Sequence, residues 1–235
     1  MNDLFAAIER SLEHGERPAD SDLVRALRSP ACPARLVEQL SGCRWVMRLG
    51  RVLPLVVRHP ACPRPFALEA MMSMGWRDLL GVARDPRAAP PVRRQAEVKL
   101  AERLAQLTSG ERTAVARQAT RSVLGHMLDT TDPLCVRAML DNPQFTETEA
   151  LRLLAGNRNP DCLVEVVRHH DWGQRPTVVR TAVRCRRMPL GVVLGMLATL
   201  TVTELQQIAE APETAVDVRQ AAARLISRRA TDQPS

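Results

Sequence analysis

Aromatic residues are scarce in this chain, whose 235 positions include no tyrosine, three tryptophans and three phenylalanines. A surface that stacks the bases of single-stranded nucleic acid needs more aromatic side chains than this composition offers. Lysine is scarcer still, because Lys99 is the only lysine among 33 basic residues. The net charge of +7 therefore comes from arginine, and it fits either the base composition of the genome or a surface that binds nucleic acid.

The six cysteines lack the close spacing that metal sites need. They lie at positions 32, 43, 62, 135, 162 and 185, and no two of them form a Cys-x-x-Cys pair. Cys32 and Cys62 each occur in the phrase Pro-Ala-Cys-Pro, which indicates a small residue packed in a recurring turn. We therefore expect inert thiols, no disulfide, no metal ion and no cofactor.

Familiar catalytic patterns are also missing, since the sequence has no Gly-rich phosphate loop, no nucleophile elbow and no His-Glu-x-x-His pair. The densest group of metal-ligand residues is His169, His170 and Asp171. Adjacent residues of a helix diverge by about 100° around its axis, so these three side chains are not expected to converge on one ion. We predict that the chain is not an enzyme and that it has no catalytic, cofactor-binding or metal-binding residue.

Targeting and membrane-spanning segments are not indicated. The first residues lack the basic region and apolar run of a secretory signal. The longest uncharged run, 188–203, is shorter than the ~20 apolar residues needed to span a bilayer. We expect a cytoplasmic protein without a membrane partner.

Two short phrases recur along the chain. Arg-x-Pro occurs at Arg28, Arg58, Arg84 and Arg158, and Val-Arg occurs at Arg93, Arg137, Arg180 and Arg219. The Val-Arg arginines are separated by 44, 43 and 39 residues (137 − 93, 180 − 137 and 219 − 180), a period typical of stacked helix pairs. The fold class predicted by this period is all-α, with the helix pairs stacked into a solenoid.

Local signals place the individual helices. Thr108, Thr146 and Thr201 each precede a glutamate by three residues, as in a capping box that satisfies the first backbone amides of a helix. Pro54 is expected to kink a helix or to begin a new one in its first turn. The helices expected from these signals and from apolar periodicity are 2–14, 21–28, 33–41, 44–58, 64–73, 76–84, 90–106, 109–117, 119–128, 133–141, 147–155, 160–169, 175–185, 189–198, 202–210 and 213–229.

Several segments resemble known helical repeats. The second-helix phrase Val218-Arg219-Gln220-Ala221-Ala222 is similar to HEAT-like repeats, and the turn Arg58-His59-Pro60-Ala61-Cys62-Pro63 is similar to the bacterial leucine-rich-repeat-variant class. Segments beginning at Trp76, Leu140 and His170 resemble bacterial HEAT-like proteins of unassigned activity. The resemblance covers roughly residues 28–228. It implies a right-handed α-solenoid of HEAT-like helical-pair repeats that offers a surface to a macromolecular partner.

Two properties of these families are not carried over. Leucine-rich-repeat variants are associated with an iron–sulfur centre on an N-terminal cysteine cluster, whereas the first cysteine of this chain is Cys32. HEAT-like solenoids also include DNA-alkylation glycosylases, which need an aspartate beside aromatic residues in a basic groove. Asp171 next to Trp172 is the only local similarity, so DNA-repair glycosylase activity is not expected.

The repeated arginines are the candidate partner-binding residues. Equivalent positions of a stacked array come into register, so Arg93, Arg137, Arg180 and Arg219 are predicted to form a ladder on the second helix of each repeat. The alternative is an internal role, in which each arginine bridges to an acidic residue of the next repeat. Trp172 is either a wedge between repeats or a partner contact.

We therefore predict a single α-solenoid over residues 1–229, with a subdivision allowed near 90–106, and a disordered tail at 230–235. Polar outer faces at both ends favour a monomer. The expected function is that of a non-catalytic scaffold that binds an unidentified protein partner. The alternative is a nucleic-acid-binding HEAT-like solenoid that uses the arginine ladders.

Overall fold

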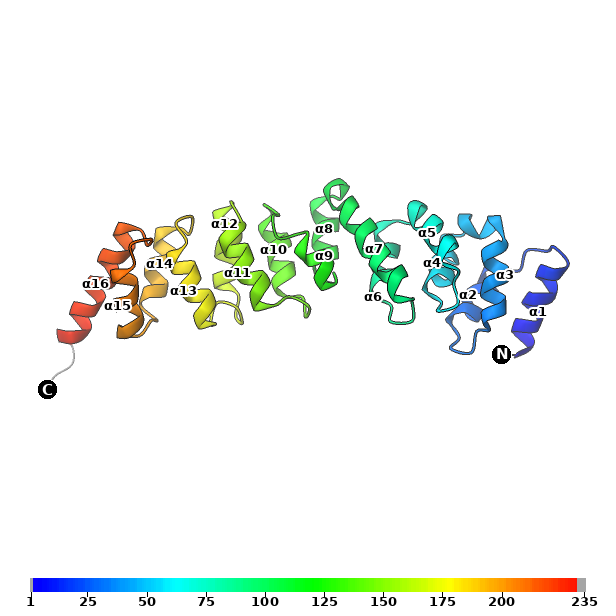
Figure 1. The fold of residues 1–235 in the computed structure, drawn as a ribbon, viewed down its shortest axis with the longest axis horizontal. Helices are drawn as coiled ribbons and strands as arrows, with labels where there is room; N and C mark the ends of the chain where they lie inside the picture. Colours follow the sequence, from blue (N-terminus) through cyan, green and yellow to red (C-terminus); the bar gives the residue numbers. More distant parts are fainter. Residues whose placement is uncertain (1, 232–235) are drawn as a thin grey trace. The chain divides into compact units, whose positions relative to one another are not determined.

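The computed structural model describes residues 2–231 (Figure 1). Every regular element in this range is helical and no strand occurs in it, which confirms the predicted all-α class. The chain separates into two compact units, 1–107 and 108–235, so the boundary falls just beyond the segment 90–106. The final helix runs to Thr231, so positions 230–231 of the predicted tail are helical, and 232–235 lie outside the described residues.

Unit 1 is built from short amphipathic helices whose apolar residues recur every three or four positions, as at Leu23, Ala26 and Leu27. The helix α4 packs against both α2 and α6, and α5 packs against α7. The elements of unit 1 are α1 (Asn2–Glu13), α2 (Asp20–Arg28), α3 (Ala34–Gly42), the 3₁₀ helix η1 (Arg44–Arg48), α4 (Leu53–Arg58), α5 (Arg64–Ser73), α6 (Trp76–Arg84), α7 (Pro90–Arg103) and η2 (Leu104–Gln106).

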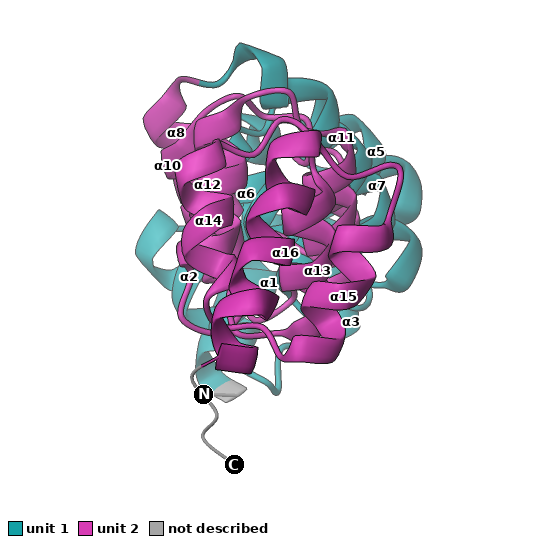
Figure 2. Ribbon diagram, turned by 90° about the vertical axis from the view of Figure 1, so that its left-hand side faces the viewer, with its two compact units in different colours: residues 1–107 teal, residues 108–235 magenta. Residues whose placement is uncertain are grey.

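Unit 2 has the same kind of helices in two rows. Figure 2 shows α8, α10, α12 and α14 along one side and α11, α13 and α15 along the other. The contacts agree with this view, because α10 packs against α8 and α12, α11 packs against α13, and α14 packs against α16. The elements of unit 2 are α8 (Ser109–Ala116), α9 (Arg121–Gly125), α10 (Pro133–Leu140), α11 (Glu147–Gly156), α12 (Pro160–Arg168), α13 (Pro176–Arg184), α14 (Leu190–Leu197), α15 (Val202–Glu210) and α16 (Val216–Thr231).

The helix signals in the sequence are confirmed. All three capping boxes form, with the Thr108, Thr146 and Thr201 side chains each paired with the glutamate three residues later. The expected helix 44–58 is interrupted, since η1 ends at Arg48 and α4 begins at Leu53 with Pro54 in its first turn. Proline is tolerated there because the first amides of a helix have no intrahelical acceptor.

One turn recurs at the ends of several helices. The first or second residue after the helix donates its backbone N–H to the carbonyl three residues earlier, and its own carbonyl accepts the N–H three residues later. The third residue after it is buried, so each turn points one small or apolar side chain into the core. The first residues of these turns include Ser29, His59, Asp85, Asn142, Cys185 and Ala211, and the buried residues are Cys32, Cys62, Ala88, Phe145, Met188 and Thr214.

The spacing of this turn along the chain varies. In unit 1 the turns at positions 29, 59 and 85 are separated by 30 and 26 residues, and in unit 2 those at 185 and 211 are separated by 26. The side chain of the first residue reinforces the turn in Ser29, His59, Asp85 and Asn142, where it accepts the backbone N–H two residues later. These separations are shorter than the period of 39–44 residues read from the Val-Arg phrase, whereas the turns at 142 and 185 are 43 residues apart (185 − 142).

Buried side chains also tie each helix end to a later turn. The amide nitrogen of Asn142 donates to the carbonyls of Ala116 (2.7 Å) and Ala119 (3.0 Å). Asn157 repeats this arrangement one helix later, and it is described in detail below. Guanidinium groups do the same for other helix ends, with Arg103 bonded to Met72, Arg187 to Ala155 and Arg229 to Ala198. These bonds satisfy carbonyls that have no partner within their own helix.

Candidate functional site

The structure separates the four Val-Arg arginines. Arg93 lies on α7 of unit 1, whereas Arg137, Arg180 and Arg219 lie on α10, α13 and α16 of unit 2. Since α10 and α13 belong to opposite rows of unit 2, Arg137 and Arg180 do not occupy equivalent positions (Figure 2). The predicted ladder is wrong for this pair, because three helices, not two, separate successive Val-Arg phrases there.

Two of these arginines form ion pairs within unit 2. Arg137 Nε lies 3.7 Å from Glu165 Oε2 on α12, and an Arg180 guanidinium nitrogen lies 3.7 Å from Glu204 Oε1 on α15. Bridging to an acidic residue of a following helix, the internal role considered above, is thus confirmed for both. The contacts are long and the arginine side chains well exposed, so each pair adds little stability and leaves the guanidinium accessible.

Arg93 and Arg219 are half-buried. The Nε of Arg219 is inaccessible to solvent and has no hydrogen-bond partner. Neither arginine forms an ion pair with a residue in the described range. The shielded Nε makes the Arg219 guanidinium less available to a partner than that of the exposed Arg137, whereas Arg180 is half-buried like Arg93.

Trp172 is a packing residue. Its side chain is buried, with 7% of the residue exposed, and its indole N–H donates to the carbonyl of Leu140 at 3.0 Å. Its ring meets Phe145 edge-on with centroids 5.5 Å apart, and the Arg175 guanidinium lies 4.3 Å above it. Of the two roles considered for Trp172, these contacts favour packing, because its ring is covered by α10 and the turns around it.

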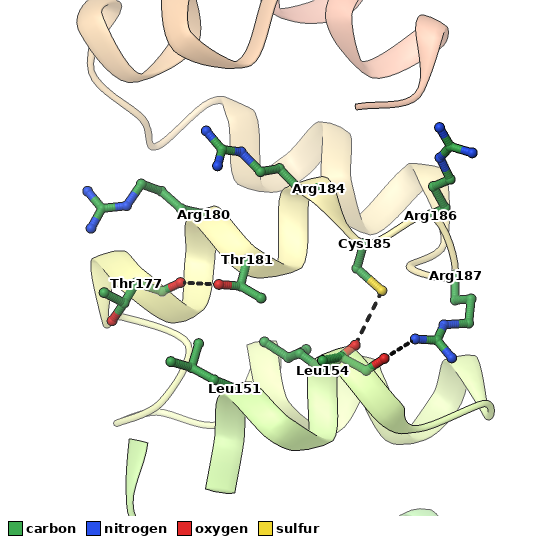
Figure 3. A pocket seen from close by; sticks show the side chains of 10 residues that line it. Leu151, Leu154, Thr177, Arg180, Thr181, Arg184, Cys185, Arg186 and Arg187 are labelled. Carbon is green, nitrogen blue, oxygen red and sulfur yellow. Dashed lines mark hydrogen bonds between the residues drawn. The ribbon is translucent and has the colours of Figure 1, made fainter. Parts of the chain in front are cut away.

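Arg180 also lines a groove of about 630 Å³ in unit 2, between α11 and α13. We call it the arginine groove, because Arg180, Arg184, Arg186 and Arg187 line it together with Leu151, Leu154 and Ala155 of α11. Figure 3 shows Arg180 and Arg184 extending from the same side of α13, whereas Arg187 bends back toward α11. No aspartate or glutamate is among the lining residues, although Glu204 and Glu213 lie beside Arg180 and Arg184.

The four arginines are held to different degrees. Arg187 is fixed, since it donates to the carbonyls of Ala155 and Gly156 at the end of α11. Arg186 Nε donates to the Glu213 carbonyl at 3.4 Å, and Arg184 Nε lies 4.0 Å from the Glu213 carboxylate. Arg180 and Arg184 thus have only long, exposed ion pairs, and an incoming anion can replace their carboxylate partners at little cost.

The walls of the groove combine this charge with apolar surface. Leu151 is half-buried and Leu154 is fully buried on the α11 side. The thiol of Cys185 contacts the Leu154 carbonyl at 3.6 Å and joins α13 to α11 at the base (Figure 3). Beside the groove, hydrogen bonds from the Thr201 backbone and hydroxyl, with Arg180 adding to them, lower the pKa of Glu204, so Glu204 is an anion at neutral pH.

The cluster of His169, His170 and Asp171 differs from the sequence prediction. These residues follow the last residue of α12, Arg168, so they are not on a helix, and their ligand atoms lie within 4.8 Å of one another. His169 Nδ1 accepts the backbone N–H of Asp171, which leaves the ring proton on Nε2, 3.2 Å from the Asp141 carboxylate. A metal ion at that nitrogen would have to displace this proton, so the geometry favours a structural hydrogen bond over a metal ligand.

The cysteines are unsuited to nucleophilic chemistry. All six are free thiols, and Cys32, Cys62, Cys135 and Cys162 are buried. Burial raises the pKa of Cys62 to about 12 and is the main cause that raises the pKa of Cys162 to about 11. These thiols therefore stay protonated at neutral pH, whereas nucleophilic attack requires the thiolate.

The sequence pattern did not single out Arg184, Arg186 and Arg187. Arg184 occupies the last residue of its helix, as do Arg28, Arg58 and Arg84, but no proline follows it at the spacing of the Arg-x-Pro phrase. The dense run of arginines at 184–187 was the available signal. This run lines a groove only because α11 packs against α13, and the spacing of residues in the sequence did not indicate that contact.

No family model, no curated protein and no solved structure matches the chain. Among the described residues, no helix combines the length and the apolar character needed to cross a membrane.

Proposed function

We propose that the chain is a non-catalytic α-solenoid scaffold whose arginine groove binds an acidic, partly apolar segment of a partner protein. The observation that carries this proposal is the composition of the groove, with four arginines beside an apolar wall and no acidic residue in the lining. Acidic side chains of a partner would pair with Arg180 and Arg184, and its apolar side chains would cover Leu151 and Ala155.

The solenoid part of the proposal rests on the order of contacts and on the recurring turn. Within each unit, helices contact their nearest and next-nearest neighbours in sequence, which is typical of stacked repeats. The resemblance of the turns and of the Val-Arg helices to HEAT-like repeats supports the same architecture. The proposal also includes a right-handed superhelix, a monomeric state and a cytoplasmic location. Sedimentation of the purified chain tests the monomeric state.

A non-catalytic role fits the chemistry of the titratable groups. The pKa values of the buried thiols are raised, so these groups lack the activated form that covalent catalysis uses. The His169 ring has both nitrogens engaged, one with a backbone N–H and one with Asp141. A base held in this way has no lone pair available for a substrate.

The test uses a fluorescein-labelled peptide of alternating glutamate and leucine and measures its binding to the full chain by fluorescence anisotropy. Arg180→Glu/Arg184→Glu should weaken binding roughly tenfold or more, because two contacts of about 1 kcal/mol each are replaced by repulsion. Arg224→Glu/Arg228→Glu is the matched control, since both arginines are exposed on α16 of the same unit and the net charge changes equally. Equal loss in the two double variants, or no loss in the first, would contradict the proposal.

Duplex nucleic acid is the second candidate ligand, and the net charge of +7 favours it. A labelled duplex oligonucleotide should then bind with an affinity that falls steeply as salt rises, because several phosphates release counterions. If the groove variant abolishes duplex binding and leaves peptide binding unchanged, the groove belongs to nucleic acid and not to a protein partner.

A further inference from the structure

Unit 1 contains a second arginine-lined pocket, distinct from the arginine groove of unit 2. It has a volume of about 580 Å³ and lies where α2, α4 and α6 meet. Its basic residues are Arg28 at the end of α2, Arg51 just before α4, and Arg58 at the end of α4. We call it the unit 1 pocket.

The unit 1 pocket and the arginine groove involve corresponding positions of two helices, α4 and α13. The residues that line the unit 1 pocket at and before α4 match the groove residues of α13 at a constant offset of 126 positions. The matched pairs are Arg51 with Thr177, Pro54 with Arg180, Leu55 with Thr181, and Arg58 with Arg184. The same face of α4 and α13 therefore lines a basic hollow in each unit. Arg58 and Arg184 occupy matched positions, and the other arginines lie at positions that do not match.

The charges around the unit 1 pocket are unbalanced. Arg28, Arg51 and Arg58 form no ion pair with any residue that the structure describes. Of the two aspartates in the lining, Asp20 is already paired with Arg17 at 2.8 Å, so Asp78 is the single carboxylate that faces the three guanidinium groups. The pocket thus has an excess of two positive charges.

Arg58 is positioned by the neighbouring helix. Gly81 of α6 has no side chain, and a Cβ at this position would overlap the Arg58 guanidinium. The guanidinium can therefore lie directly on α6, where its Nε is shielded from solvent and lacks a hydrogen-bond partner. Burial raises the pKa of Asp78, and the charge of Arg58 opposes this shift. The Arg58 guanidinium, next to two further unpaired cations, is a favourable arrangement for binding an anion.

We propose that the unit 1 pocket binds a phosphate dianion, as the free ion or as a phosphate monoester, between Arg28, Arg51 and Arg58. A phosphate monoester carries about −1.5 to −2 charges at neutral pH, which matches the excess of the pocket. Its oxygens accept several charge-assisted hydrogen bonds, and planar guanidinium groups donate these in pairs. The three arginines of this pocket suit a compact anion, whereas the apolar wall of the unit 2 groove suits a peptide segment.

The experiment is a calorimetric titration of the full chain with inorganic phosphate at constant ionic strength. The expected result is saturable binding of one phosphate per chain. Arg58→Met and Arg51→Met should each weaken it about tenfold or more, because each removes a charge-assisted contact. Arg51 is exposed, so its variant keeps the test valid if Arg58→Met fails to fold. Asp78→Asn should tighten binding, since it removes the opposing carboxylate.

Arg94→Met is the matched control, because Arg94 is an exposed arginine of α7 outside the pocket lining. No saturable binding to the unaltered chain, equal losses in Arg94→Met and Arg51→Met, or weaker binding in Asp78→Asn would each overturn the proposal. A parallel titration with O-phosphoserine identifies the source of the phosphate. Comparable affinity assigns the pocket to a phosphorylated side chain, and binding of inorganic phosphate alone assigns it to the free ion.

Discussion

Replacing Asn157 with alanine should destabilise unit 2 more than most single substitutions. Its side-chain amide donates to the carbonyls of Leu128 (3.2 Å) and Thr130 (2.7 Å), and its Oδ1 accepts the backbone N–H of Asn159 (2.9 Å). Only 2% of the residue is exposed, so water cannot replace these bonds without opening the turn. Asn157→Ala removes all three at once.

The magnitude follows from the number of bonds and their burial. A net contribution of about 1 kcal/mol for each hydrogen bond gives about 3 kcal/mol, and carbonyls left without a partner add to this value. We expect the free energy of unfolding to fall by about 2–4 kcal/mol. Asn157→Asp should cost at least as much at neutral pH, because a carboxylate would face two carbonyl oxygens where the amide donated.

Urea denaturation followed by far-ultraviolet circular dichroism measures the change, with Gln206→Ala as the control. Gln206 is an exposed amide on α15, so its loss should change stability by less than about 0.5 kcal/mol. If Asn157→Ala unfolds at the same urea concentration as Gln206→Ala, the cross-turn amide bonds do not hold the helix pairs together. Asn142→Ala offers an independent repeat, because Asn142 makes the same three kinds of bond.

Two further predictions concern the turns. Burial is the main cause that lowers the pKa of His59 in the folded chain; the charge of Arg87 lowers it further, and a hydrogen bond with the Cys32 backbone opposes the shift. As the pH falls through about 6.5, the unfolded chain therefore binds a proton at this histidine before the folded chain does. Stability should therefore fall as the pH drops through about 6.5. His59→Asn keeps an acceptor for the Ala61 N–H and should lose this dependence in urea titrations, and an unchanged dependence would contradict the assignment. Gly173→Ala should lower the melting temperature, because its Cβ would overlap the Val167 carbonyl and lie 2.9 Å from the His169 carbonyl. Gly195→Ala is the control, since Gly195 has open space around it inside α14, and this variant should stabilise the chain by about 0.5–1 kcal/mol. Similar melting temperatures for the two variants would refute the packing argument.

The helices were predictable from sequence because their signals are local. The capping boxes at Thr108, Thr146 and Thr201 involve residues three positions apart, and Pro54 acts within its own turn. The burial of Cys32 and Cys62 was predictable for a similar reason, since the Pro-Ala-Cys-Pro phrase marks the same turn twice. Such short-range patterns need no knowledge of which helices become neighbours.

Which helices pack against one another could not be predicted from such local patterns. Val-Arg recurs on α10, α13 and α16, three helices apart, whereas the turns at 29, 59 and 85 and those at 185 and 211 are two helices apart. The candidate site depends on this register, because Arg184 and Arg187 meet Leu154 only through the packing of α13 on α11. His169 was misplaced for another reason. Helical geometry was assumed beyond Arg168, whereas α12 ends there and the chain turns.

The most direct test of the central claim is to locate a bound acidic segment. The glutamate–leucine peptide, carrying one photoreactive residue, would be cross-linked to the full chain and the attachment sites identified by mass spectrometry. We predict attachment around Leu151, Ala155 and Thr181, and its loss in Arg180→Glu/Arg184→Glu. Attachment at other surfaces, or attachment at the groove that the double variant leaves unchanged, would contradict the proposed role of the arginine groove.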